Sequence, residues 1–187
     1  MSIPAEIAEA PVVHDLYGHA LRECVRGGLY MEFGVGTGKS LRSLQRLIGP
    51  GTALYGFDSF LGLPEAWEGF PVGSFATGTF RPKINGVTLV EGLFEDTVPR
   101  FAEEHPYYVS FMHFDCDLYS STKTVLEAFS DQVVDGTVMV FDDYFSYTDN
   151  AERRAFLEWS TDRKWTWRCI GRWNHYRAAF KMIGRAR

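Results

Sequence analysis

Pairs of acidic residues follow two apolar runs in the second half of the chain. Asp115 and Asp117 come after one run, and Asp142 and Asp143 come after the next. Such runs are typical of central parallel strands, whose carboxyl ends share one edge of a sheet. Four carboxylates gathered there repel one another unless a cation neutralises them. Any one of them could instead cap a helix or pair with an arginine. The set of four predicts a divalent-cation site, with Mg²⁺ favoured and Ca²⁺ or Mn²⁺ as alternatives.

A glycine-rich turn is the second group of residues suited to chemistry. Residues 30–40, YMEFGVGTGKS, lead from an apolar run through three glycines into leucines at helical spacing. Glycine lets the backbone turn sharply and lets a ligand approach closely. A P-loop would need glycine where the chain has Phe33, and a dinucleotide fingerprint would need it at Lys39. The pattern E-x-G-x-G-x-G, which begins at Glu32, resembles the S-adenosylmethionine loop of class I methyltransferases. A glycine-rich turn without a ligand is the alternative.

A further acid, Asp58, ends the apolar run 53–57. A carboxylate one βαβ step after the glycine turn can accept hydrogen bonds from both hydroxyls of a ribose. The next 28 residues, 59–86, are rich in Gly, Pro and aromatic residues and lack a helical period. Long connections of this kind are usually functional, so we expect a lid or pocket wall, with a stabilising surface loop as the alternative. Phe60, Trp67 and Tyr144 could give the pocket aromatic walls.

Strand-like and helix-like segments alternate along most of the chain. We expect an N-terminal helix over 12–26, within an N-terminal segment 1–28, and a helix that ends near Ile48. Later strands are expected over 87–90, 107–114 and 137–141, and a final hairpin over 164–170 and 175–183. Three helix starts are expected: one capped by Asp96 or Thr97 with Pro99 opening the helix, one by Ser120 or Ser121, and one by a box of Asp149 and Glu152.

This order of segments predicts a single α/β domain over residues 1–187. We expect a Rossmann-like, mostly parallel seven-stranded sheet with a C-terminal antiparallel hairpin. The composition, 45% hydrophobic and 23% charged, is that of a globular protein.

The composition also bounds the partners and the compartment. Three cysteines without metal spacing, and no signal peptide or membrane span, predict a cytoplasmic protein with reduced thiols. A net charge of −5 argues against a nucleic-acid substrate and leaves a small-molecule acceptor. The basic segment after residue 150 could meet another subunit in a homo-oligomer.

Four motifs together resemble the macrocin O-methyltransferase family. They are FDSFLGLPE at 57–65, EGLFEDTVP at 91–99, HFDCDLYSST at 113–122 and FDD at 141–143. The resemblance covers about residues 29–160. Members of that family methylate sugar hydroxyls of macrolide and aminocoumarin antibiotics, and they use S-adenosylmethionine and Mg²⁺. The resemblance therefore implies a class I methyltransferase fold and a Mg²⁺-assisted O-methyltransferase that acts on a sugar moiety.

The resemblance also implies roles for individual residues. Asp115, Asp142 and Asp143 would bind the metal, and Asp117 would be the general base. His113 is an alternative base, although a buried, hydrogen-bonded histidine is the simpler interpretation at that position. The cofactor site would be lined by Glu32, Gly34, Gly36, Asp58, Ser59, Phe94 and Asp115.

Two other functions remain open at this point, a nucleoside-triphosphate enzyme and a non-catalytic cofactor-binding relative, although a binding protein has no use for four carboxylates that repel one another. The run VMVFDD resembles a Walker B strand, so a P-loop-like nucleoside-triphosphate enzyme is the main rival. A catechol-type O-methyltransferase is a variant of the first interpretation, because vicinal oxygens on an aromatic ring can bind a metal in the same way.

Overall fold

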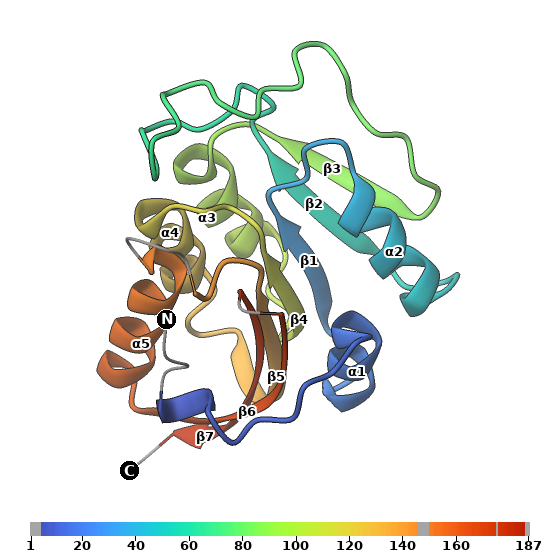
Figure 1. Ribbon diagram of the computed structural model, residues 1–187. Helices are drawn as coiled ribbons and strands as arrows, with labels where there is room; N and C mark the ends of the chain where they lie inside the picture. The colour runs from blue at the N-terminus through green and yellow to red at the C-terminus, as the bar shows by residue number, and fades with distance from the viewer. Residues whose placement is uncertain (1–4, 146–149, 175, 186–187) are drawn as a thin grey trace.

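Seven strands form one sheet with helices on both of its faces (Figure 1). The computed structural model describes residues 5–145, 150–174 and 176–185. The strands are β1 (Leu29–Phe33), β2 (Leu54–Asp58), β3 (Val87–Glu91), β4 (Val109–Phe114), β5 (Val133–Phe141), β6 (Trp165–Trp173) and β7 (Arg177–Arg185). The helices are the short 3₁₀ helix η1 (Ala5–Ile7), α1 (Leu16–Glu23), α2 (Lys39–Ile48), α3 (Phe94–Glu104), α4 (Tyr119–Ala128) and α5 (Ala151–Asp162).

The order of the strands confirms the predicted fold class. It runs β3-β2-β1-β4-β5-β7-β6, with β1 to β5 parallel and β7 antiparallel to both β5 and β6. The chain builds outward from β1 to β3 and then returns to add β4 on the other side of β1. The carboxyl ends of β1 and β4 therefore flank the point where strand order reverses. Open α/β sheets bind their ligands at this point.

Each face of the sheet has its own apolar core. Helices α3, α4 and α5 cover one face, and α1 and α2 cover the other (Figure 1). Every residue of β1 and β4 is buried, as expected for parallel strands with helices on both sides. On the second face, Leu41 and Leu44 of α2 are fully buried at helical spacing, whereas Leu47 on the same helix is 47% exposed.

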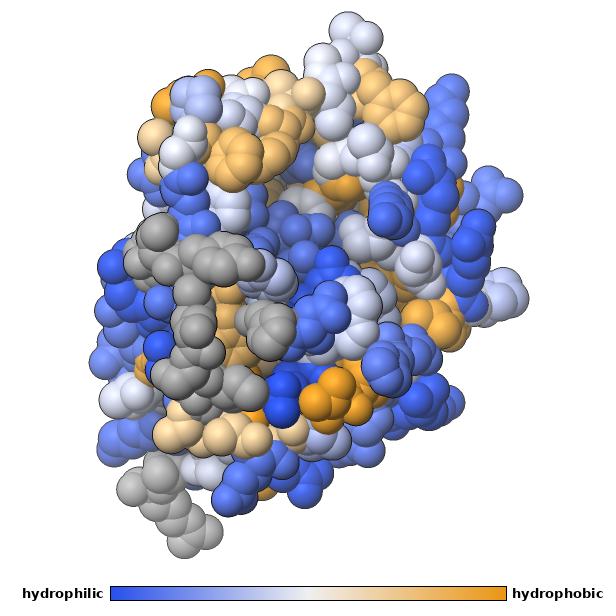
Figure 2. Space-filling view, in the orientation of Figure 1, coloured by the Kyte–Doolittle hydropathy of each residue, from blue (hydrophilic) through white to orange (hydrophobic). Residues whose placement is uncertain are grey.

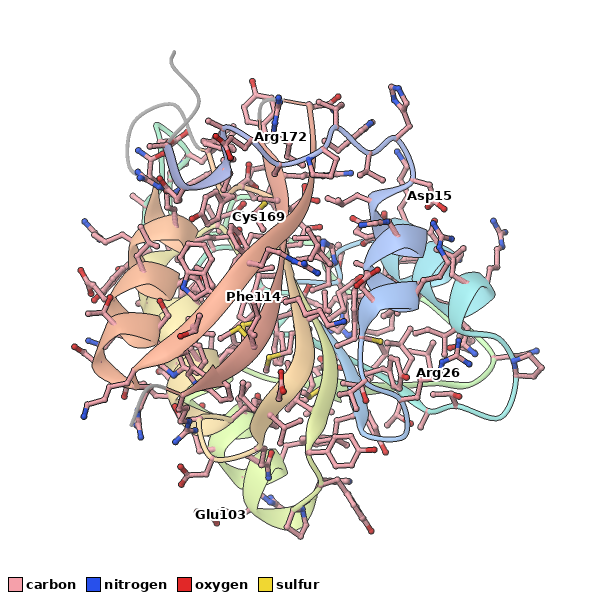
Figure 3. The ribbon with its side chains drawn as sticks, turned by 90° about the horizontal axis from the view of Figure 1, so that it is seen from below. Asp15, Arg26, Glu103, Phe114, Cys169 and Arg172 are labelled. Carbon is pink, nitrogen blue, oxygen red and sulfur yellow. The ribbon has the colours of Figure 1, made fainter. Side chains whose placement is uncertain are left out.

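The N-terminal helix is shorter than predicted because other contacts hold its neighbours. Val12 forms a bridge with Arg172 of β6, and Asp15 accepts a hydrogen bond from the Gly18 amide (3.0 Å) at the start of α1. Figure 3 shows Arg172 beside this N-terminal segment; its amide donates to the Pro11 carbonyl (2.9 Å). Residues 11–13 therefore run along the edge strand instead of forming helix.

The predicted helix starts differ from the structure in three places. Helix α3 begins at Phe94, so Asp96 and Thr97 lie in its first turn and Pro99 lies inside it. The amides of Asp96 (3.2 Å) and Thr97 (3.1 Å) both donate to the Leu93 carbonyl, upstream of the proline. Helix α4 begins at Tyr119, and neither serine caps it. Asp149 lies outside the described residues, and Glu152 is buried in contact with two loops of the sheet edge.

The other boundaries differ by a few residues. Strand β5 begins at Val133, four residues earlier than predicted, and the hairpin strands β6 and β7 each extend further toward the C-terminus. Within the described residues, no helix is long and apolar enough to cross a membrane.

The two leucines of α2 give a matched test of the second core. Replacing Leu44 by Ala removes a fully buried side chain, and such changes cost about 2–5 kcal/mol of the free energy of unfolding. The same change at the half-exposed Leu47 should cost only about 0.5 kcal/mol. Urea denaturation of the two variants measures the difference. Equal losses would contradict the assigned face of α2.

Candidate active site

A cavity of about 490 Å³ opens at the carboxyl ends of β1, β2 and β4. The glycine turn, the start of the 59–86 segment, the start of α3 and the loop after β4 form most of its wall. Figure 2 shows the hollow on this face, with hydrophilic residues around it and apolar residues along the upper rim. Seven of the residues proposed from the sequence line it: Gly34, Gly36, Asp58, Ser59, Phe94, Asp115 and Asp117.

The glycine turn is fitted against the acidic loop after β4. Gly34 has φ of +90°, and a β-carbon there would lie 1.8 Å from the carbonyl oxygen of Asp115. Gly36 also has a positive φ, of +50°, but a β-carbon there would meet nothing within 4 Å. Only glycine therefore allows the turn at position 34 to touch the acidic loop. This contact places the glycine turn and Asp115 in one cavity wall.

Asp58 holds the glycine turn in shape. One oxygen of its carboxylate accepts hydrogen bonds from the amides of Val35 (2.8 Å) and Gly36 (2.7 Å). The other oxygen accepts from the Phe60 amide (2.7 Å), which opens the 59–86 segment. Asp58 thus joins the turn to the segment above it. Its predicted contact with a ribose stays a prediction.

Glu32 and His113 lie behind the cavity and are completely buried. Glu32 accepts a hydrogen bond from the Ser40 hydroxyl (3.0 Å) and lies 3.0 Å from His113 Nδ1. The other ring nitrogen of His113 is 3.1 Å from the Tyr17 hydroxyl and 3.5 Å from Asp142. Glu32 therefore supports α2 and His113, and it does not lie in the cavity wall where a direct cofactor contact was expected.

The surroundings of His113 fit a buried, hydrogen-bonded histidine. Burial lowers its pKa, but Tyr17, Asp142 and Glu32 together raise the pKa of His113 well above its ordinary value. The ring lies within hydrogen-bond reach of Glu32 on one side and of Tyr17 and Asp142 on the other, as this simpler interpretation requires. The alternative role of His113 as a base stays a prediction.

The four strand-end acids separate into two overlapping groups. Oxygens of Asp115, Asp117 and Asp143 lie within 4.8 Å of one another, and so do ligand atoms of Asp115, Asp142 and His113. Asp117 lies beyond β4, and its φ of +63° turns the chain so that its carboxylate stays near Asp115. The adjacent Asp142 and Asp143 join different groups, as expected for neighbours in extended chain.

Asp142 is already neutralised by basic side chains. Arg177 contacts both of its oxygens, with Nε at 2.5 Å and Nη2 at 2.8 Å. Burial alone would raise the pKa of Asp142, but His113 and then Arg177 lower it. Asp142 is therefore a charged partner of His113 and Arg177 in this structure.

The other acids carry the repulsion that the sequence predicted. Burial, followed by Asp142, raises the pKa of Asp115 to about 7. Burial, followed by Asp143 and Asp115, raises the pKa of Asp117 to about 8. Carboxyl oxygens this close, with pKa values this high, form the kind of hard-ligand set that a divalent cation stabilises. Asp115, Asp117 and Asp143 thus fit such an ion, and Asp142 could join them only by sharing its contacts with Arg177.

Sequence analysis missed several residues of the cavity wall, among them two with polar groups near the acids, and misassigned others. Tyr17 and Arg177 line the cavity. Tyr17 comes from α1, and Arg177 comes from the start of β7. The fold pairs β7 with β5, and no sequence motif surrounds either residue. Among the three aromatic residues proposed for the wall, Phe60 and Tyr144 are buried in the cores. Trp67 is not among the lining residues; Tyr17, Phe75 and Phe94 line the cavity instead.

The strand order, the glycine turn after β1 and the acid after β2 define the class I methyltransferase fold. The sequence profile of the family described as macrocin-O-methyltransferase (TylF) matches residues 79–170. The recognition of this family from four sequence motifs is thereby confirmed. The chain is an O-methyltransferase related to the macrocin O-methyltransferases. Among curated proteins, none matches the chain.

Solved structures agree with this assignment. The chain is 26% identical to the calicheamicin methyltransferase CalS11, with a TM-score of 0.70, covering 89% of this chain and 75% of that one. A second structure describes CalS11 as a TDP-rhamnose 3'-O-methyltransferase, at 24% identity and a TM-score of 0.60, with the same shares covered. The O-methyltransferase NovP shares the fold, with 19% identity, a TM-score of 0.64, and 91% and 79% of the two chains covered.

A further structure with this fold contains ligands. It is the methyltransferase MycE of mycinamycin biosynthesis, in complex with Mg, SAH and mycinamycin VI. It is 15% identical to this chain, with a TM-score of 0.57, covering 91% of this chain and 48% of that one.

The contact between Gly34 and Asp115 can be tested with a matched pair of substitutions. Gly34→Ala should disrupt the site, because the added carbon meets backbone oxygen that cannot move alone. Gly36→Ala adds the same atom in open space and should cost only the strain of a left-handed alanine, about 1–2 kcal/mol. Thermal unfolding of both variants gives the comparison. A Gly34→Ala protein as stable as Gly36→Ala would contradict the contact.

The raised pKa values predict a pH dependence of stability. In the unfolded chain, Asp115 and Asp117 lose their protons near pH 4, whereas in the folded protein they keep them to about pH 7 and 8. The free energy of unfolding therefore falls as pH rises from about 4 toward 8. Asp115→Asn removes one repelling charge. In EDTA, its melting temperature should exceed that of wild type by an amount that grows from pH 5 to pH 8. A difference independent of pH would contradict the assigned repulsion.

Proposed function

We propose that this enzyme transfers a methyl group from S-adenosylmethionine to a hydroxyl of a small molecule, with a divalent cation, Mg²⁺, held by the acidic cluster. The observation that carries this proposal is the shared cavity. The glycine turn and the acidic loop after β4 both line it, and they meet where Gly34 lies against the Asp115 backbone. A donor on the turn and an acceptor at the acids would therefore meet.

The donor side of the cavity suits an adenosyl ligand. The glycine turn offers close approach to backbone, and Ser59 and Phe94 add a hydroxyl and an aromatic surface beside Asp58. Because Asp58 already accepts amides on both oxygens, we expect it to keep the turn in the shape that the donor needs, in addition to any ribose contact. The donor would supply its methyl group from the sulfonium to this cavity.

On the acceptor side, Asp115 and Asp143 would hold the cation, with Asp117 beside them. A bound Mg²⁺ supplies Lewis acidity, which lowers the pKa of a hydroxyl, and it fixes the direction of that hydroxyl. We assign Asp115 and Asp143 to the ion first, because Asp142 is paired with Arg177. Asp142 would then complete the predicted set of three ligands or orient it through His113.

Asp117 is the residue that we expect to take the proton. It lines the cavity beside Asp115, so its carboxylate is in place to accept the proton of a hydroxyl held next to the cation. A bound donor would supply the methyl carbon to the acceptor oxygen, and its sulfur would leave as the neutral thioether. The hydroxyl proton passes to the Asp117 carboxylate, so charge and atoms balance. General base catalysis of this kind contributes about 10²–10⁴ in rate.

For the acceptor we propose a sugar hydroxyl of a natural product. CalS11 is described as acting on a sugar nucleotide, and MycE was crystallised with mycinamycin VI. Leu63, Phe75 and Phe94 give the cavity apolar surface beside its acids, which suits a sugar face. A catechol would present the same pair of oxygens. The net charge of −5 favours a small acceptor over nucleic acid.

A nucleoside-triphosphate enzyme fits the site less well. In a P-loop, the Ser or Thr after the lysine binds Mg²⁺. Here the Ser40 hydroxyl donates to the buried Glu32, and Phe33 fills the place of the first glycine in the core. Lys39 lines the cavity, but the amides of Val35 and Gly36, which a phosphate cradle would use, donate to Asp58.

Ligand-induced stabilisation tests the proposed donor and cation. A ligand that binds the folded state stabilises it. S-adenosylhomocysteine should therefore raise the melting temperature, whereas ATP with Mg²⁺ should leave it unchanged.

Turnover of a sugar acceptor should be lost in EDTA and return with Mg²⁺. Asp117→Asn should lower kcat by about 10²–10⁴ while S-adenosylhomocysteine binding is kept. Full activity in EDTA would remove the cation from the proposal, and stabilisation by ATP alone would favour the rival enzyme class.

A further inference from the structure

One buried carboxylate beside the acidic cluster has no role in methyl transfer as described so far. Glu152 is the second residue of α5, and its exposed fraction is 0%. It does not line the cavity. Its side chain reaches from the helix to the edge of the sheet, where the loops after β4 and β5 lie.

Glu152 connects those two loops through their backbone. Its Oε1 accepts a hydrogen bond from the Cys116 amide (3.4 Å), and its Oε2 accepts from the Asp143 amide (3.1 Å). Cys116 stands between Asp115 and Asp117 in the chain. The Glu152 side chain therefore links the loop that contains Asp115 and Asp117 to Asp143, the third acid of the cluster.

An acid at this place is electrostatically costly. Burial raises the pKa of Glu152 well above its ordinary value, and Asp143 and Asp117 raise it further. A glutamine would avoid that repulsion, but it has one acceptor oxygen and would direct its NH₂ group at the other amide. A buried amide left without an acceptor costs about 1–3 kcal/mol. Two acceptor oxygens, one for each loop, are what the carboxylate supplies here.

The spacing of the acids depends on those loops. Three carboxylates that repel one another move apart unless their backbone is fixed. Residues that orient metal ligands without touching the metal commonly change metal affinity by 10–100-fold when they are replaced. Glu152 meets the structural condition for such a residue, because both of its hydrogen bonds go to the backbone that carries the ligands.

We propose that Glu152 is a positioning residue that fixes the distance between the Asp115–Asp117 loop and Asp143, and thereby sets the affinity of the site for a divalent cation. This inference rests on the proposed function. It assigns to α5 a part in the site that neither the sequence motifs nor the wall of the cavity indicates.

Glu152→Gln tests the inference, with Glu158→Gln as the matched control. Glu158 is an exposed acid of the same helix, and its side chain contacts Tyr119 outside the cavity wall. Titration calorimetry with Mg²⁺, in the presence of S-adenosylhomocysteine, measures the cation affinity. Glu152→Gln should bind Mg²⁺ about 10–100-fold more weakly. It should bind S-adenosylhomocysteine as wild type does, and high Mg²⁺ should restore part of its lost turnover. Glu158→Gln should match wild type throughout.

The outcomes separate this inference from the function on which it rests. If wild type binds Mg²⁺ and Glu152→Gln binds it equally well, Glu152 has only a structural role and the inference fails. If wild type binds no Mg²⁺, the cation of the proposed function fails first. Should Glu152→Gln not fold, the same titration on Glu152→Asp decides, because the shorter carboxylate cannot reach both amides; wild-type affinity there would overturn the inference.

Discussion

Repulsion among carboxylates at the ends of β4 and β5 is the constraint that shapes this site. The protein relieves part of it internally, because Asp142 is paired with Arg177 and lies 3.5 Å from His113. Asp115 and Asp117 keep raised pKa values, and Asp143 lies with them. In the proposed function, a bound cation would offset the repulsion among these three acids. Glu32 and Glu152 are buried beside them, and burial raises the pKa of each.

A second constraint joins the two halves of the cavity. The glycine turn touches the Asp115 backbone at Gly34, so the walls proposed for the donor and for the cation cannot shift independently. Asp58 extends this connection to the 59–86 segment through three amide hydrogen bonds. Methyl transfer requires an oxygen aligned behind the methyl group, and a rigid contact between the two walls is a simple means to that alignment.

The sequence predicted the parts of the fold and site that short-range patterns specify. Continuous apolar runs that end in acids predicted β1, β4 and β5, and the spacing of the glycines predicted the turn after β1. Contacts between distant elements carry no such pattern. Arg177 reaches Asp142 only because β7 pairs with β5, and Tyr17 reaches His113 from α1. Glu152 looked like part of a helix cap in sequence, whereas tertiary contacts direct it to the two loops.

The most direct test of the central claim is a crystal structure with S-adenosylhomocysteine and Mn²⁺, with the ion located by its anomalous scattering. We predict one strong anomalous peak bound by Asp115 and Asp143, next to Asp117, and S-adenosylhomocysteine against the turn at Gly34 and Gly36 in the same cavity. A cofactor on the turn without an ion at these acids, or an ion bound far from the cofactor, would contradict the account.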